Sequence, residues 1–341
     1  MDNLIYSLNA TMPVFLVMVV GYILRQLGMF SDEFLKVANK FNFNITLPAL
    51  LLINMLECDI RSTFDGKYVL YCAVVTLICI ITTWFLAKLL LKDKSIVGEF
   101  VQGAYRGSAA ILGIALMTNI SGNADMAPLM ILGSVPIYNI FAVIVLTFEA
   151  PDIVGKNSDK NDKIEGTKIG TIIKDNIQVK NVKTEKIKKA FIGICKNPII
   201  LSILGGMLLS YAGFELPTIP YKVVESIGSM TTPLALIIIG AGFEGRKAIK
   251  KIAPAIMATL IKLVIQPAIF LPIAILFGFS AEKIVAALIM LGAPTTATSY
   301  IMSKNMGHEG VLSSSIIVLT TLLSAFTITA WIFVLRSFNY I

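Results

Sequence analysis

Long apolar runs fill most of the chain, and short polar connections separate them. A helix needs roughly 20 predominantly apolar residues to cross the hydrocarbon core of a bilayer. Sliding along the chain for such runs predicts ten membrane-spanning helices, at Leu4–Leu24, Phe41–Leu56, Tyr68–Leu91, Glu99–Ile120, Met126–Phe148, Phe191–Phe214, Val223–Phe243, Ile252–Phe277, Lys283–Met302 and Val311–Val334.

One long polar stretch, residues 149–190, divides these runs into two sets of five. It is rich in lysine and asparagine and poor in aromatic residues, which is typical of a solvated linker. A regulatory module is the alternative. We predict a first five-helix repeat over residues 1–148, a cytoplasmic lysine-rich loop over 149–190 and a second five-helix repeat over 191–341.

An odd number of spans per repeat forces the second copy to insert upside down, as in many secondary transporters. Weak internal similarity supports this arrangement. The segment Asn44–Leu52 matches Ser229–Ile237, and Gln102–Ala110 matches Leu291–Ser299. We therefore expect an all-α integral membrane fold made of two inverted repeats.

Composition supports a membrane location. Hydrophobic residues make up 56% of the chain and charged residues 15%, whereas soluble domains carry about 45–50% and 25%. A water-soluble enzyme, a nucleic-acid binder and a disordered scaffold are therefore poor fits. The net charge of +8 is mainly an orientation signal, because the short connections on one side carry 11 Lys and Arg against 5 on the other. The positive-inside rule then predicts a multi-pass plasma-membrane protein with both termini outside.

Known reaction motifs are missing from the sequence. It contains no P-loop, HExxH, GxSxG or dinucleotide fingerprint, and no Cys or His spacing typical of zinc or haem. We expect no enzymatic activity, no cofactor, no metal and free cysteines. The histidine, His308, lies in a predicted turn, where we expect it to be solvated.

Two basic residues lie deep inside predicted spans, Arg106 in the fourth and Lys262 in the eighth. At 1.5 Å per residue they lie roughly 12 and 16 Å from the span ends, while the acidic residues fall at span rims. Buried unpaired charge is costly and marks a functional site by default. A cargo anion would supply the missing negative charge. The alternatives are that Arg106 bonds backbone carbonyls and that Lys262 snorkels.

Glycine and proline interrupt the fourth and ninth spans. Gly103, Gly107 and Gly113 weaken the fourth, and Gly292 and Pro294 weaken the ninth. A break exposes helix N-termini, whose free N–H groups favour a carboxylate. We therefore predict crossover and hinge positions at these glycines. Close helix packing is the alternative explanation for such small residues.

Polar side chains gather near these breaks and near prolines of other spans. Ser108, Thr295 and Thr296 offer hydroxyl groups, and Asn44 offers an amide oxygen. Pro48 and Pro233 are expected to kink the second and seventh spans. The predicted substrate-binding set is Arg106, Gly107, Ser108, Pro294, Thr295, Thr296, Asn44 and Lys262.

Three motifs together resemble the auxin efflux carrier family in its bacterial, malate permease-like form. They are Phe43–Leu51, Gln102–Ile114 and Ala293–Met302, and they lie in family order across both membrane halves. The resemblance implies a ten-helix fold of two inverted repeats with crossing broken helices 4 and 9, a scaffold beside a moving transport domain, and a homodimer. It also implies a substrate carboxylate near residues 106–108 and 294–296. Relatives often have Asn where Ser108 stands and Pro near Ala115, so the first crossover here relies on glycines.

We expect a permease that exports a small organic anion, such as malate, by elevator-type alternating access driven by the membrane potential. Two other hypotheses stay open. One is a membrane sensor on the same fold, with the basic loop as its output. The other is an ion-coupled carboxylate importer. The implied partners are the organic anion and the lipid bilayer, with no nucleic acid.

Overall fold

The computed structural model describes residues 2–57, 65–108, 117, 126–150, 196–214 and 216–341. Within these ranges the protein is all-helical, and extended pairing is confined to an isolated bridge between Gly107 and Thr295. Five helical stretches in the described residues are long and apolar enough to cross a membrane: Gly66–Leu90, Ala127–Phe148, Thr218–Ala241, Ile252–Leu276 and Val311–Ser337. The protein is therefore a multi-pass membrane protein, as the apolar runs predict.

The helices follow the apolar runs closely. Before the central polar stretch they are α1 (Asp2–Gln26), α2 (Asp32–Phe41), η1 (Asn42–Thr46), α3 (Leu47–Leu56), α4 (Gly66–Leu90), η2 (Lys94–Ile96), α5 (Val97–Tyr105) and α7 (Ala127–Phe148). After it they are α9 (Pro198–Ala212), α10 (Thr218–Ser229), α11 (Thr231–Ala241), α12 (Gly245–Lys250), α13 (Ile252–Leu260), η4 (Ile261–Ile265), α14 (Gln266–Leu276), α15 (Ala281–Gly292), α16 (Thr298–Asn305) and α17 (Val311–Ser337).

The second apolar run belongs to a longer helical stretch than the sequence pattern predicts. Helix α2 begins at Asp32, nine residues before the predicted start at Phe41, because the Ser31 side chain accepts a hydrogen bond from the Phe34 N–H and caps the helix. The added turns are amphipathic, with charged residues such as Asp32 and Lys40, so a search for apolar runs overlooks them.

Two short π-helices, η1 and η4, each lead into a proline. Pro48 and Pro267 stand in the first turn of the α-helices that follow. Proline has no N–H and frees the carbonyl four residues earlier, and a π-turn inserts one extra residue at such a point. For Pro267 the freed carbonyl is that of Leu263, which accepts a hydrogen bond from the Trp331 indole at 3.0 Å.

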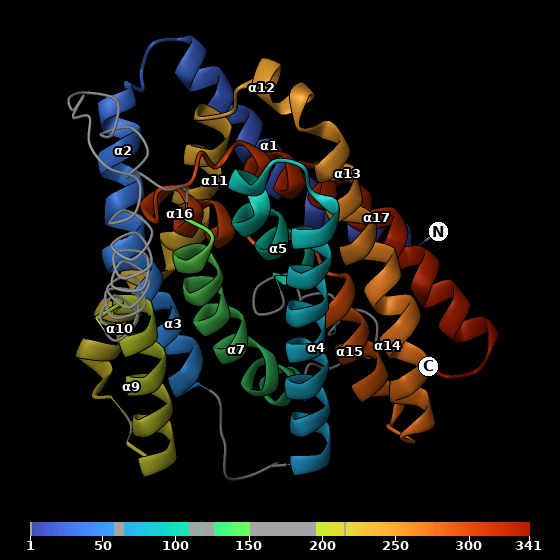
Figure 1. Ribbon diagram of the computed structural model, residues 1–341. Helices are drawn as coiled ribbons and strands as arrows, with labels where there is room; N and C mark the ends of the chain where they lie inside the picture. Colours follow the sequence, from blue (N-terminus) through green and yellow to red (C-terminus); the bar gives the residue numbers. More distant parts are fainter. Residues whose placement is uncertain (1, 58–64, 109–116, 118–125, 151–195, 215) are drawn as a thin grey trace, which may run out of the picture.

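Glycines allow the closest helix contacts of the bundle. A Cβ atom at Gly240 of α11 would lie 1.8 Å from the Met18 carbonyl oxygen of α1, and one at Gly21 would lie 2.3 Å from the Ile237 carbonyl oxygen. Helix α1 therefore packs backbone to backbone against α11. In Figure 1, α2, α3, α9 and α10 lie on one side of α5, α7 and α16, and α13, α14 and α17 lie on the other.

Two polar groups near one end of the bundle are buried, and for His308 this contradicts the sequence prediction. His308 is 4% exposed rather than solvated, and its Nε2 lies 3.0 Å from the Leu146 carbonyl oxygen. Gly98 leaves the room for this ring, because a Cβ there would lie 2.8 Å from the imidazole. Glu99, predicted at a rim, is buried and accepts hydrogen bonds from the Gly310 and Ser313 N–H groups. Its carboxylate thus caps α17, where the helix dipole favours negative charge.

Candidate functional site

The ends of two helices, α5 and α15, meet in the interior of the protein. Helix α5 ends at Tyr105, and the chain between α15 and α16 leaves the helical path over residues 293–297. The two non-helical stretches run antiparallel, with the Ser108 N–H donating to the Pro294 carbonyl at 2.8 Å. The Thr295 hydroxyl donates to the Gly103 carbonyl at 2.7 Å. We call this junction, residues 106–108 with 293–297, the crossing.

Local sequence explains why both helices stop here. Pro294 has no N–H, so the Met290 carbonyl loses its normal partner four residues ahead. On the other segment, Arg106 takes an extended conformation with φ −87° and ψ 111° directly after the last residue of α5. Gly107 allows the close approach, since a Cβ there would lie 3.1 Å from the Met290 carbonyl oxygen.

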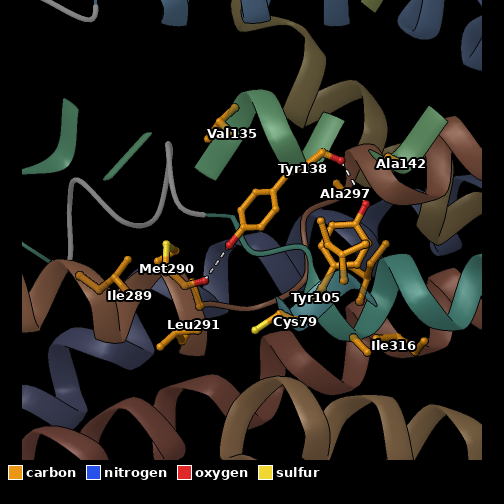
Figure 2. Packing of buried hydrophobic residues seen from close by; sticks show 14 of the residues in the cluster. Cys79, Tyr105, Val135, Tyr138, Ala142, Ile289, Met290, Leu291, Ala297 and Ile316 are labelled. Carbon is orange, nitrogen blue, oxygen red and sulfur yellow. Dashed lines mark hydrogen bonds between the residues drawn. The ribbon is translucent and has the colours of Figure 1, made fainter. Parts of the chain in front are cut away.

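Lys262 bonds the backbone groups that these interruptions leave without helical partners. Its side chain is fully buried, and its Nζ donates to the Tyr105 carbonyl and to the Met290 carbonyl, each at 3.1 Å. The Tyr138 hydroxyl also donates to the Met290 carbonyl, at 3.3 Å, as Figure 2 shows. The Lys262 side chain from η4 thus joins the ends of α5 and α15, and the Tyr138 side chain from α7 adds a second bond to the end of α15.

Arg106 is also buried, at 3% exposed, but it bonds side chains rather than backbone. Its guanidinium donates to the Asn139 Oδ1, to the Gln102 Oε1 at 3.3 Å and to the Met302 sulfur at 2.8 Å. Each of these acceptors is neutral. Among the described residues, neither Arg106 nor Lys262 forms an ion pair.

A small cavity of about 50 Å³ opens beside Arg106. Its walls come from α3, from α7 and from the crossing: Leu47, Leu50, Leu51, Asn54, Arg106, Gly107, Ser108, Val135, Tyr138, Asn139, Thr296 and Thr298. A cavity needs about 10–15 Å³ to hold one water molecule, so this one has room for a few waters or for a small polar group. The positive charge that lines it is that of Arg106.

A larger cavity of about 870 Å³ lies between α2, α11 and α16. Four of its lining residues are basic, Arg25, Lys36, Lys40 and Lys304, and two are acidic, Asp32 and Glu244. The two cavities are lined by successive parts of the same two chain segments. The larger one borders residues 35–40 and 300–305, whereas the smaller one borders residues 47–54 and 296–298.

The structure brings most of the predicted site residues together at the crossing. Arg106, Gly107, Ser108 and Thr296 line the small cavity, while Pro294, Thr295 and Lys262 form the buried frame of the crossing. Asn44 lies apart, because its side chain is exposed and donates to the Lys40 carbonyl of its own helix at 2.8 Å.

The predicted hinge residues have different surroundings. Gly103 and Gly292 are buried next to the crossing, Pro48 is half-buried at the start of α3, and Pro233 lies on an exposed face of α11. Gly113 lies outside the described residues, as does nearly all of the predicted loop.

Sequence reasoning missed the residues that surround Arg106. Gln102 stands four positions before Arg106, a spacing that places two side chains on one helix face, so it could have been found. Asn139 is a polar residue within the apolar helix α7, which is also a detectable signal. Met302 gave no such signal in the sequence, because a methionine in an apolar helix is typical of a hydrophobic core.

The described residues contain no group of three or more His, Cys, Asp or Glu side chains that could hold a metal ion. Cys72 and Cys79 are free and buried. The chemistry available at the crossing is therefore that of two cations, hydroxyl groups, amides and backbone dipoles.

Comparison with known proteins agrees with this architecture. The sequence profile of the auxin efflux carrier family, described as membrane transport protein, matches residues 6–332. The chain belongs to this family. The resemblance read from the three sequence motifs is thereby confirmed.

Two relatives match nearly the whole chain, and a third matches less than half of it. An uncharacterised transporter of Methanocaldococcus jannaschii is 21% identical over 95% of this chain and 97% of its own length. An uncharacterised transporter of Escherichia coli is 20% identical over 98% and 99%. A Rhizobium meliloti protein named "Putative malonate transporter" is 26% identical over 42% of this chain and 45% of its own length. The family and these relatives are transporters, not enzymes.

Proposed function

We propose that this protein is a secondary transporter that exports a small organic anion, a malonate- or malate-like carboxylate. The observation that carries the proposal is the buried guanidinium of Arg106, which lines a cavity and bonds neutral side chains. A buried cation without a counter-charge is costly. A carboxylate in the cavity lowers that cost, and its two oxygens match the forked geometry of a guanidinium.

Polar groups around the cavity suit the rest of such a ligand. The Thr296 and Ser108 side chains and the Asn54 amide line the same space, and each can bond a second carboxylate or a hydroxyl. The relative named for malonate supports a carboxylate cargo. Apolar walls from Leu47 and Leu51 match the carbon chain of the anion.

The basic cavity between α2, α11 and α16 is the proposed entrance from the cytoplasm. Its four basic side chains outnumber its two acidic ones, so the cavity attracts an anion and raises its local concentration. From this cavity, η1 and the start of α16 lead to Arg106. The inside-negative potential then favours anion exit by about 2.3 kcal/mol per charge per 100 mV.

We propose that the transporter has ten spans in two inverted repeats, at residues 1–148 and 191–341, joined by the 149–190 loop. The crossing belongs to a domain that moves past a scaffold containing α3. The support is the size of the cavity, because about 50 Å³ between α3 and the crossing admits a carboxylate group but requires separation of the two walls to pass a whole dicarboxylate. A plasma-membrane location, outward termini and a homodimer complete the proposal.

Flux of labelled malonate and malate from proteoliposomes, at imposed potentials, tests the proposal. Export must rise with an inside-negative potential. We expect Arg106→Ala to reduce flux at least about 100-fold, equivalent to ~2.7 kcal/mol, while the protein stays folded. Arg246→Ala is the matched control, since Arg246 is exposed on α12.

Other outcomes would replace this function. If flux survives Arg106→Ala, Arg106 has a structural role and does not bind the cargo. Flux that does not depend on the membrane potential contradicts a uniport. Flux that follows an imposed sodium or proton gradient favours the importer. Carboxylate binding without flux favours a sensor.

A further inference from the structure

Lys262 differs from an ordinary substrate ligand in what it contacts. It sits in the π-helical turn η4 and is fully buried, and both of its hydrogen-bond acceptors are backbone carbonyl oxygens. Those oxygens belong to Tyr105 and Met290, in the last turns of α5 and α15. A π-turn within a long helix frequently marks a functional position.

The two carbonyls form a site for positive charge. The C-terminal end of a helix carries a partial negative charge, and two such ends converge here. In transporters with interrupted helices, carbonyls of this kind coordinate the coupling sodium ion or proton. The Tyr138 hydroxyl fixes the Met290 carbonyl from a third side. The two backbone carbonyls thus provide part of a cation site, and the Lys262 ammonium occupies it.

The ammonium packs directly against the crossing. A Cβ atom at Gly107 would lie only 3.0 Å from the Lys262 Nζ, so the ammonium reaches the backbone of the crossing itself. Acidic side chains that would draw a metal ion do not cluster among the described residues.

We propose that the Lys262 ammonium is a built-in replacement for a coupling cation. It holds the ends of α5 and α15 together, so that the crossing forms and binds its ligand without sodium or any other metal ion. As far as transport is concerned, this inference rests on the proposed carboxylate export. The assembly of the crossing does not depend on the cargo.

The first test uses the unmodified protein. Its melting temperature, and its malonate flux, are measured in sodium, potassium and N-methylglucamine salts of equal ionic strength. We expect the same values in all three. A requirement for sodium or potassium in either measurement would overturn the inference.

The second test removes the ammonium and returns it as a free ion. Lys262→Ala deletes three carbons and the nitrogen, which propylammonium replaces atom for atom. We expect a lower melting temperature and at least about a tenfold loss of flux. The buried Tyr105 carbonyl loses the Lys262 ammonium, and the Met290 carbonyl keeps only the Tyr138 hydroxyl. Added propylammonium restores both the melting temperature and the flux of Lys262→Ala. Added sodium restores each of them in part. Lys262→Met fills the space without charge, so it shows the same losses and no restoration.

Three results of this second test contradict the inference. They are wild-type behaviour of Lys262→Ala without added cation, folded Lys262→Ala that no cation restores, and Lys262→Gln that equals the wild type. The last result would mean that a neutral hydrogen bond suffices. If Lys262→Ala does not fold, Lys262→Gln and the salt comparison still decide. The melting temperature needs no cargo, so failure of carboxylate flux would refute the proposed function and leave this test intact.

Discussion

The surroundings of Arg106 and of Lys262 differ although the two residues look alike in the sequence. Both are basic residues inside apolar runs, and both are buried at the crossing. Arg106 bonds neutral side chains and lines a cavity, whereas Lys262 bonds two backbone carbonyls in a packed interior. These contacts are the basis for proposing a ligand-binding role for Arg106 and a structural role for Lys262. The proposed roles follow from the hydrogen-bond acceptors, because position in an apolar run does not separate the two residues.

The largest effect expected in a test of this contrast comes from the glycine that touches Lys262. In Gly107→Ala the added Cβ lies 3.0 Å from the Lys262 Nζ and 3.1 Å from a backbone oxygen. Overpacking of this kind costs about 1–3 kcal/mol, and flux should be lost with it. Chemical denaturation and proteoliposome flux provide the measurements.

Gly292→Ala is the matched control at the other interruption. Its Cβ would meet only ordinary contacts, 3.5 Å from Leu288 and 3.6 Å from Pro267. We expect a stability change below about 1 kcal/mol. Equal losses in the two variants would show that any substitution near the crossing is harmful, and that contact with Lys262 has no special weight.

An effect on stability of similar size, but with a smaller effect on flux, should separate two neighbouring threonines. Thr295 is buried and donates to the Gly103 carbonyl, while Thr296 is half-buried and lines the cavity. Thr295→Val leaves a buried carbonyl unpaired, so we expect a loss of about 1–3 kcal/mol in the free energy of unfolding. Thr296→Val should leave stability within about 0.5 kcal/mol and raise the KM for carboxylate export. The reverse pattern would mean that the ligand lies on the Thr295 side of the non-helical segment 293–297, and not on the Thr296 side.

Apolar periodicity and the glycine and proline positions predicted much of the fold. Apolar runs gave the positions of α4, α7 and α17 to within three residues, and the helix interruptions fall next to Gly107 and Pro294. These features depend on local chemistry, which the sequence carries directly. The start of α2 was missed because its turns are amphipathic and not apolar.

The partners of the buried charges were harder to predict, since they depend on contacts between distant segments. Nothing near Lys262 in the sequence points to the carbonyls of Tyr105 and Met290. Asn44 was included for its residue type, yet its helix turns it away from the crossing. His308 is buried only because Gly98 of α5 leaves space for it. Helix packing decides each of these cases.

Equilibrium binding of labelled malonate and malate to the purified protein tests whether the Arg106 charge binds a carboxylate. We compare the wild type with Arg106→Gln, which keeps a polar side chain without the charge, and with Asn44→Ala as the exposed control. We expect wild-type affinity for Asn44→Ala and at least about a tenfold weaker affinity, ~1.4 kcal/mol, for Arg106→Gln. Unchanged carboxylate affinity in a folded Arg106→Gln protein would contradict this role of Arg106.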